Sequence, residues 1–203
     1  MSAPTTITIR APSKYSSSTT PASPQSPPPL EWLHRTWSVT HSTLSMWRSA
    51  RNVRITYKPL PAHHSISYLP RLDDLVEYES LSGKGSVKTV AGIDTASSAS
   101  SSAWDWRGKG WLMIASSHWE VLGWGERPRE GGDGTERWAV TWFAPTLFTK
   151  EGIDIYSDRK EGLSEETLGE IMAALKGCGI KAVEEMCNRD MRAIEIALPW
   201  KER

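Results

Sequence analysis

Large apolar side chains alternate with polar or small ones along much of this chain, and the alternation begins at Trp37. A period of two is typical of strands with one buried face, so residues 37–41 and 53–57 are predicted strands. Turn residues separate such segments, and no long helical period occurs between residues 3 and 156. Short strands divided by turns predict a closed barrel or a sandwich. The same pattern predicts strands at 72–78, 86–93, 118–124, 137–143 and 153–156, with a dense Trp- and Gly-containing segment at 104–115.

The period changes after Leu163. Ser164 is a suitable N-cap residue, and the carboxylates that follow it favour the first turn of a helix. Apolar residues then recur at i, i+3, i+4 and i+7, which predicts one amphipathic helix that ends at Gly177 or Gly179. Alternation returns within residues 192–200 and allows a short last strand. The chain is therefore predicted to be all-β, with seven or eight antiparallel strands and one C-terminal helix.

The first 29 residues have a different composition. They are rich in Ser, Thr and Pro and contain Arg10 and Lys14 but no acidic residue. We predict a disordered tail at residues 1–29 and one folded domain at residues 30–203. No apolar signal segment precedes the domain, which favours a cytoplasmic protein. A mitochondrial transit peptide is the alternative, although the prolines would break its amphipathic helix.

Charge and cysteine content exclude several partners. Lys plus Arg and Asp plus Glu both number 24, so the formal net charge is zero and gives no electrostatic reason to expect a nucleic acid or a membrane surface. No apolar run is long enough to form an integral membrane segment. Cys178 and Cys187 match no metal motif, the His63-His64 pair in a proline-flanked loop is a weak metal site, and Asp73-Asp74 fits a solvated strand start. We therefore expect neither a metal nor a cofactor, and the sequence leaves the oligomeric state open.

Aromatic content is the most unusual part of the composition, with 11 Trp against 2 Phe. Ten of the indoles lie between Trp32 and Trp142. A single indole that buries about 150–250 Å² is ordinary core packing, but this many exceed what one small barrel packs easily. Some of them are therefore expected to line a cavity or its rim. On the strand at 137–143, Trp138 and Trp142 share one face, opposite Thr141.

Three segments carry a resemblance to the lipocalins and the wider calycins. Residues 153–157, Arg159 and residues 163–168 with the following helix are similar to the last barrel strand and docking helix of bacterial-type lipocalins, although Asp158 departs from that pattern. Trp37 stands where the family has Gly-x-Trp, without the Gly. The loop at 42–52 stands where the family has its lid loop. The resemblance covers about residues 30–190 and is weakest at 104–124.

The resemblance implies an eight-stranded antiparallel up-and-down lipocalin-like β-barrel with a docked α-helix. It also implies that Trp37 plugs one end of the barrel, that Arg159 packs over its ring, and that Trp47 lies on a lid. An eight-stranded barrel can hold one small ligand. The first hypothesis is a carrier or sequestering protein for a small apolar molecule. Its expected ligand-binding residues are Trp47, Tyr57, Trp104, Trp106, Trp111, His118, Trp138 and Trp142.

The second hypothesis is a lipocalin-fold isomerase or cyclase that acts on a hydrophobic substrate in biosynthesis. A histidine beside a carboxylate in an apolar cup can serve as acid and base. The candidates are His41, His118, Asp105 and Asp154. A thiol enzyme is disfavoured because both cysteines lie at or beyond the helix, and haem is disfavoured because no histidine follows His118. The third hypothesis is a solid barrel that acts as a structural or interaction module.

Overall fold

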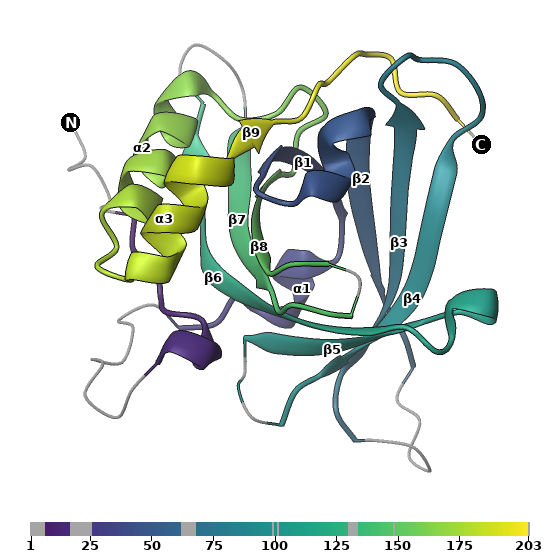
Figure 1. The fold of residues 1–203 in the computed structure, drawn as a ribbon, viewed down its shortest axis with the longest axis horizontal. Helices are drawn as coiled ribbons and strands as arrows, with labels where there is room; N and C mark the ends of the chain where they lie inside the picture. Colours follow the sequence, from purple (N-terminus) through teal and green to yellow (C-terminus); the bar gives the residue numbers. More distant parts are fainter. Residues whose placement is uncertain are drawn as a thin grey trace.

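Eight antiparallel strands close into a barrel in the computed structural model, in which β1 pairs with both β8 and β2 (Figure 1). The described residues are 7–16, 26–61, 68–98, 100, 102–129, 134–147 and 149–202, so the His63-His64 pair lies outside them. The predicted eight-stranded up-and-down barrel with a docked helix is confirmed. The strands are Thr36–Ser42 (β1), Ala50–Pro59 (β2), Arg71–Ser80 (β3), Lys88–Ala96 (β4), Ala103–Gly108 (β5), Ser116–Pro128 (β6), Thr135–Phe143 (β7) and Gly152–Ser157 (β8).

Alternation along the strands separates two hydrophobic clusters. On β8, Tyr156 points into the barrel, whereas its neighbours Ile153 and Ile155 point outward to the helices. The interior cluster consists of Leu33, Trp37, Val39, Leu44, Trp47, Ala50, Val53, Ile55, Tyr57, Leu72, Trp104, Trp119, Val121, Ala139, Tyr156 and Ile194. The helix-side cluster consists of Ile9, Leu122, Trp138, Val140, Trp142, Ile153, Ile155, Ile171, Leu175, Val183, Met186, Cys187 and Met191.

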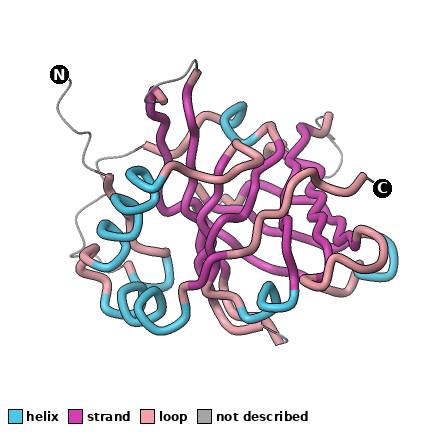
Figure 2. Tube along the Cα trace, turned by 90° about the horizontal axis from the view of Figure 1, so that it is seen from above, coloured by secondary structure: helices cyan, strands magenta, loops and turns pink. Residues whose placement is uncertain are grey.

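Two helices, Glu165–Lys176 (α2) and Lys181–Asp190 (α3), pack together on one side of the barrel (Figures 1 and 2). Ser164 caps α2 as predicted, since its side chain accepts a hydrogen bond from the Thr167 amide. Only one helix was predicted, so α3 is a correction. Its buried stripe is short, with Val183, Met186 and Cys187 at i, i+3 and i+4, and this stripe is too brief to stand out in the sequence. The last strand is shorter than expected, Arg192–Ala193 (β9), and pairs with β1.

Short helical turns occupy the connections and the N-terminal segment. Leu30–Leu33 (α1) precedes β1, and Ser45–Ser49 (η2) joins β1 to β2. Gly110–Leu112 (η3) lies between β5 and β6, in the region where the lipocalin resemblance was weakest. Ser13–Tyr15 (η1) belongs to the segment that precedes the barrel.

Residues 7–16, which the sequence placed in the tail, lie along the outside of β6. The Arg10 amide donates to the Leu122 carbonyl at 2.9 Å, and the Arg10 guanidinium lies 2.8 Å from the buried Glu120 carboxylate. The Ser13 amide and hydroxyl donate to the same carboxylate at 2.9 and 2.5 Å. Residues 1–6 and 17–25 of the predicted tail lie outside the described residues, and the domain boundary at residue 30 stays a prediction.

Candidate functional site in the barrel interior

Trp119 lies at the centre of a stack of aromatic rings inside the barrel. Its indole stacks on Tyr57 with ring centroids 5.5 Å apart and on Trp104 at 5.9 Å. The Trp119 indole N–H donates to the Asp94 carboxylate at 2.8 Å. Because these side chains come from β2, β5, β6 and β4, the stack spans the interior from wall to wall. The ring faces form an apolar surface around the Asp94 carboxyl group.

One end of the barrel is covered by η2. Trp47 on this turn is buried and packs edge-on against Tyr78 of β3, with ring centroids 5.5 Å apart. Its indole N–H lies beside Asp154, and this contact partly lowers the pKa of the Asp154 carboxyl group. The Ser42 hydroxyl donates to the same carboxyl group at 2.5 Å. The turn that covers the barrel thus contributes both an aromatic ring and a polar group to the interior.

The opposite end is closed by α1 and Trp37. The Trp37 indole donates to the Leu33 carbonyl at 3.2 Å, and Trp37 is fully buried. Arg35, rather than the predicted Arg159, lies over the Trp37 ring, 5.4 Å from its centroid. Arg35 lies in the bend between α1 and β1, where its amide donates to the Leu33 carbonyl at 2.7 Å. Arg159 instead pairs with Glu161 at 3.1 Å.

Three aspartates, Asp74, Asp94 and Asp154, are buried inside this aromatic shell. Burial raises the pKa of Asp94 to about 7 and the pKa of Asp154 to about 7. Burial also raises the pKa of Asp74 well above its usual range, and the neighbouring Asp94 adds to that shift. The interior therefore holds carboxyl groups that keep a proton up to neutral pH.

Two tyrosines and a threonine complete this polar group. Burial raises the pKa values of Tyr57 and Tyr156 well above their ordinary value, and the nearby carboxyl groups add to the shift. Thr141 lies beside Tyr156, since it faces inward from β7 at the position paired with Asp154. Both tyrosines stay protonated at neutral pH and can donate or accept hydrogen bonds.

Several buried polar atoms in this interior have no hydrogen-bond partner among the described residues. Leaving a buried polar atom unpaired costs about 1–3 kcal/mol, so such atoms are rare unless water or a ligand completes them. Among these atoms are Asp74 Oδ1 and Asp94 Oδ2. The Trp47 indole instead lies beside Asp154, and the Thr141 and Tyr156 hydroxyls lie beside each other.

Comparison with known proteins gives the fold without a close relative. No family model matches the chain, and no curated protein matches it. H1 crustacyanin from the lobster Homarus americanus aligns with a TM-score of 0.51 at 9% identity, covering 81% of this chain and 77% of that chain. Lobster apocrustacyanin A1 gives 0.49 at 9% identity, covering 83% and 79%. The siderocalin Ex-FABP, described as having dual ligand specificities, gives 0.48 at 9% identity, covering 80% and 93%.

The closed barrel of eight antiparallel strands and the structural alignment with H1 crustacyanin both indicate the same fold. The fold is lipocalin-like. At 9% identity the comparison concerns the fold alone, so the chemistry of this lipocalin-like barrel has to come from its own residues.

Four of the predicted ligand-binding residues lie in the interior of the lipocalin-like barrel. Trp47, Tyr57 and Trp104 belong to the interior cluster, and Trp106 packs against it. Of the predicted catalytic candidates, Asp154 is in the interior as well.

Trp138 and Trp142 belong to the helix-side cluster, which corrects their assignment to the ligand-binding set. The alternation on β7 was identified, but the inward face is the other one, which carries Ala139 and Thr141. The pairing of Ala139 with Tyr156 across β7 and β8 decides this orientation. Trp111 lies on η3 with 87% of its surface exposed, outside the barrel.

His118 and Asp105 were predicted as parts of an acid–base pair in the cavity. The structure brings them together, with His118 Nδ1 and Asp105 Oδ1 2.7 Å apart, and His118 Nε2 lies 3.7 Å from Glu120. The pair lies outside the barrel, because their strand neighbours Trp104 and Trp119 point inward. His41 also lies away from the interior, since Ser42 beside it is the inward residue, and burial lowers the pKa of His41.

The predicted site residues do not include Asp74, Asp94, Trp119, Thr141 and Tyr156. The sequence predicts a solvated strand start at Asp73-Asp74, but Asp74 is buried. One signal was available, since Asp74 has the same parity as Leu72, which packs in the interior. A carboxylate on the apolar parity of a strand is unusual and indicates a function for it.

No group of three or more His, Cys, Asp or Glu side chains within the described ranges is placed to hold a metal ion. In the same part of the chain, every helix falls short of the length and apolarity needed to cross a membrane.

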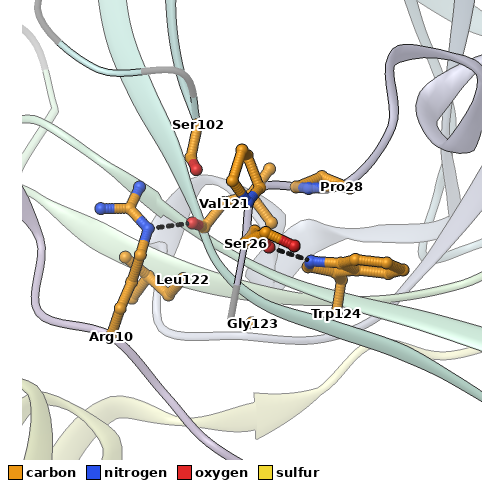
Figure 3. A pocket seen from close by; sticks show the side chains of 9 residues that line it. Arg10, Ser26, Pro28, Ser102, Val121, Leu122, Gly123 and Trp124 are labelled. Atoms are coloured by element: carbon orange, nitrogen blue, oxygen red, sulfur yellow. Dashed lines mark hydrogen bonds between the residues drawn. The ribbon is translucent and has the colours of Figure 1, made fainter. Parts of the chain in front are cut away.

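A small pocket between the N-terminal segment and β6 is too small to be the ligand site. Figure 3 shows Arg10 donating to the Val121 carbonyl on one side of it, and Trp124 donating to the Ser26 carbonyl on the other. Its volume is about 10 Å³, close to the least that a single water molecule needs. The pocket is therefore a packing gap along the N-terminal segment.

The buried Asp154 leads to a prediction on stability. The pKa of Asp154 is about 7 in the folded protein, against about 4 when unfolded. The folded state holds this proton more tightly than the unfolded state does. The contribution of the proton to the free energy of unfolding is therefore fully present below about pH 4 and is lost as the pH rises to about 7. The loss is about 1.4 kcal/mol per pH unit. Asp154→Asn is expected to reduce the fall of the unfolding free energy over this range, measured by urea denaturation. The exposed Asp105, changed to Asn, serves as the control, and an unchanged slope in Asp154→Asn would contradict the prediction.

Proposed function

We propose that this lipocalin-like protein binds a small, largely apolar molecule inside its barrel, as a carrier or by sequestering it. The observation that carries the proposal is the pair of buried carboxyl oxygens without partners among the described residues, Asp74 Oδ1 and Asp94 Oδ2, in an apolar interior rich in aromatic rings. Small-molecule sites are mostly apolar, with a few placed polar groups that orient the ligand. The aromatic stack around Trp119 supplies the apolar part, and the hydroxyl and carboxyl groups supply the orienting part.

A neutral apolar probe, N-phenyl-1-naphthylamine, tests this function. We expect its emission to rise to saturation at one probe per chain, and candidate ligands to displace it. Thr141→Phe adds an aromatic ring at the inward position beside Tyr156 and is expected to weaken the affinity by about tenfold or more. The matched control is Thr89→Phe, which places the same side chain on the exposed surface of β4.

Overpacking a core costs about 1–3 kcal/mol, so both variants are compared well below their melting temperatures. Absence of saturable binding to the unmodified protein would contradict the proposed function. Equal probe affinity in Thr141→Phe and Thr89→Phe would indicate that the probe binds outside the barrel interior.

Catalysis is the second candidate function, as an isomerase or cyclase acting on a hydrophobic substrate. The observation that favours it is that Asp94 and Asp154 both have a pKa of about 7. A general acid or base works best when its pKa lies near the operating pH, and an interior that excludes water strengthens the electrostatic interactions of such groups. Asp154 was among the catalytic candidates, whereas His41, His118 and Asp105 have no inward position that supports such a role.

Metabolite extracts test the catalytic alternative. Cells that produce the unmodified protein are compared by mass spectrometry with cells that produce the double variant Asp94→Asn, Asp154→Asn. Loss of one product with accumulation of its isomer would support catalysis, provided the variant still binds the neutral probe. Identical extracts would contradict it.

A further inference from the structure

Two carboxyl groups in the interior of the barrel lack a cationic partner. Asp74 and Asp94 are buried, and each has one carboxyl oxygen without a hydrogen-bond partner among the described residues, Asp74 Oδ1 and Asp94 Oδ2. The Trp119 indole donates to the other oxygen of Asp94, and the Trp106 indole lies beside Asp74. No other polar group of the described chain completes the two free oxygens. Both are acceptors that lack a donor.

The nearest cations do not balance these carboxyl groups. Lys109 acts on Asp74 from the end of β5, but it is exposed and pairs with Asp73. Arg48 acts on Asp154, but it is exposed on η2 and donates to the backbone carbonyls of Ser42 and Asp190. The other groups that interact electrostatically with the pair are the Tyr57 and Tyr156 hydroxyls inside the barrel and the carboxyl groups of Asp73 and Asp105 outside it, none of which is positively charged.

A glycine in β4 makes room for an aromatic ring beside these two carboxyl groups. Gly92 lies opposite Asp74 in the register of β3 and β4, and two residues before Asp94. A Cβ atom on Gly92 would lie 2.1 Å from Trp106 Nε1. Glycine thus allows the Trp106 ring to lie against β4, beside Asp74. Tyr57 is paired with Asp74 across β2 and β3, and its ring stacks on Trp119, whose N–H donates to Asp94. Aromatic faces attract cations, most strongly where water is excluded.

We propose that the ligand carries a basic nitrogen, which binds as an ammonium group at Asp74 and Asp94, beside the rings of Tyr57 and Trp106. The inference rests on the proposed function and specifies the class of ligand. An ammonium group offers donors to Asp74 Oδ1 and Asp94 Oδ2 and supplies the missing positive charge. A carboxylate ligand would be repelled by the same groups.

The pH dependence distinguishes an amine from a neutral ligand. Burial raises the pKa of Asp94 to about 7 and the pKa of Asp74 well above its usual range, so the empty site holds protons at neutral pH. An ammonium group favours the ionised carboxylates, so its binding releases protons and tightens as the pH rises through neutrality. A neutral acceptor such as an alcohol or ketone would take hydrogen bonds from the protonated carboxyl groups, and its binding would weaken over the same range.

Isothermal titration calorimetry with three probes of one shape tests the inference: 2-phenylethylamine, 2-phenylethanol and phenylacetate. At about pH 8 we expect the amine to bind about tenfold or more tightly than the alcohol, and phenylacetate more weakly than both. Titrations in buffers of different ionisation enthalpy are expected to show proton release for the amine. Asp74→Asn and Asp94→Asn are expected to remove the preference for the amine. Asp73→Asn, a neighbouring aspartate on the outer face, should keep it.

The outcomes separate the inference from the function beneath it. Equal affinity for amine and alcohol, proton uptake, or no binding of the amine while N-phenyl-1-naphthylamine saturates the site would overturn the inference alone. Failure of the neutral probe and all three test compounds would overturn both. Circular dichroism melting of each variant confirms that it is folded under the assay conditions.

Discussion

Replacing Trp119 by alanine is expected to lower the free energy of unfolding by about 4 kcal/mol. The indole is buried between the rings of Tyr57 and Trp104, and no exposed segment can collapse into the space that it leaves. The substitution also removes the hydrogen bond to Asp94, whose carboxyl group would then have no donor. Urea or guanidinium denaturation, followed by circular dichroism, measures the change.

Two further variants separate ring packing from hydrogen bonding. Trp119→Phe keeps an aromatic ring in the stack and loses the N–H donor, so we expect a loss of about 1–3 kcal/mol. Trp111→Ala removes an indole that is 87% exposed and is expected to change stability by about 0.5 kcal/mol or less. If Trp119→Ala were no more destabilising than Trp111→Ala, Trp119 would not be a central packing residue of the barrel.

Replacing Arg10 by alanine is expected to lower the free energy of unfolding by about 3 kcal/mol. Glu120 is fully buried on the outer face of β6, and Arg10 is its charged partner at 2.8 Å. Ser13 still donates two hydrogen bonds to Glu120 in this variant, but hydrogen bonds alone do not neutralise the buried charge. The loss of charge pairing should also release residues 7–16 from β6. Chemical denaturation measures the stability, and hydrogen exchange at residues 7–16 measures the release.

Two comparisons make the Arg10 prediction specific. Adding Glu120→Gln to Arg10→Ala removes the unpaired charge and is expected to recover much of the lost stability. Lys14→Ala breaks a more exposed pair with Glu151, in which 43% of the Lys14 side chain is accessible, and is expected to change the stability little, because water and salt screen the pair. An effect of Arg10→Ala as small as that of Lys14→Ala would mean that the N-terminal segment contributes little to the barrel.

Hydrophobic alternation accounts for most of what could be predicted of the fold. The segments at 37–41, 53–57, 137–143 and 153–156 all lie within observed strands, because alternation directly reflects a sheet with one face buried. The segment at 104–115 was harder, since it combines β5 with the turn η3 in few residues. Helix α3 was missed because its apolar stripe is one turn long.

The candidate site was predictable only in part. Trp47, Tyr57, Trp104 and Trp106 were selected because large aromatic residues are scarce and informative. Trp138 and Trp142 were placed on the wrong side, because alternation divides a strand into two faces without saying which one is inside. Two register shifts, between Val39 and His41 and between Val121 and Gly123, interrupt the alternation and prevent its extrapolation from one strand end to the other.

The sequence by itself determined an antiparallel β domain, either a closed barrel or a sandwich, with an amphipathic C-terminal helix and a large number of indoles, since each of these depends on local periodicity or on composition. The choice of the barrel came from the resemblance to the lipocalins. Only the tertiary structure decided that Asp74, Asp94 and Asp154 are buried inside that barrel, while His118 and Asp105 meet outside it. The physical reason is that the inward face of each strand depends on its register with its neighbours and on the closure of β1 against β8. Closure removes the carboxyl groups from water, and this desolvation makes ordinary aspartates into a candidate binding site.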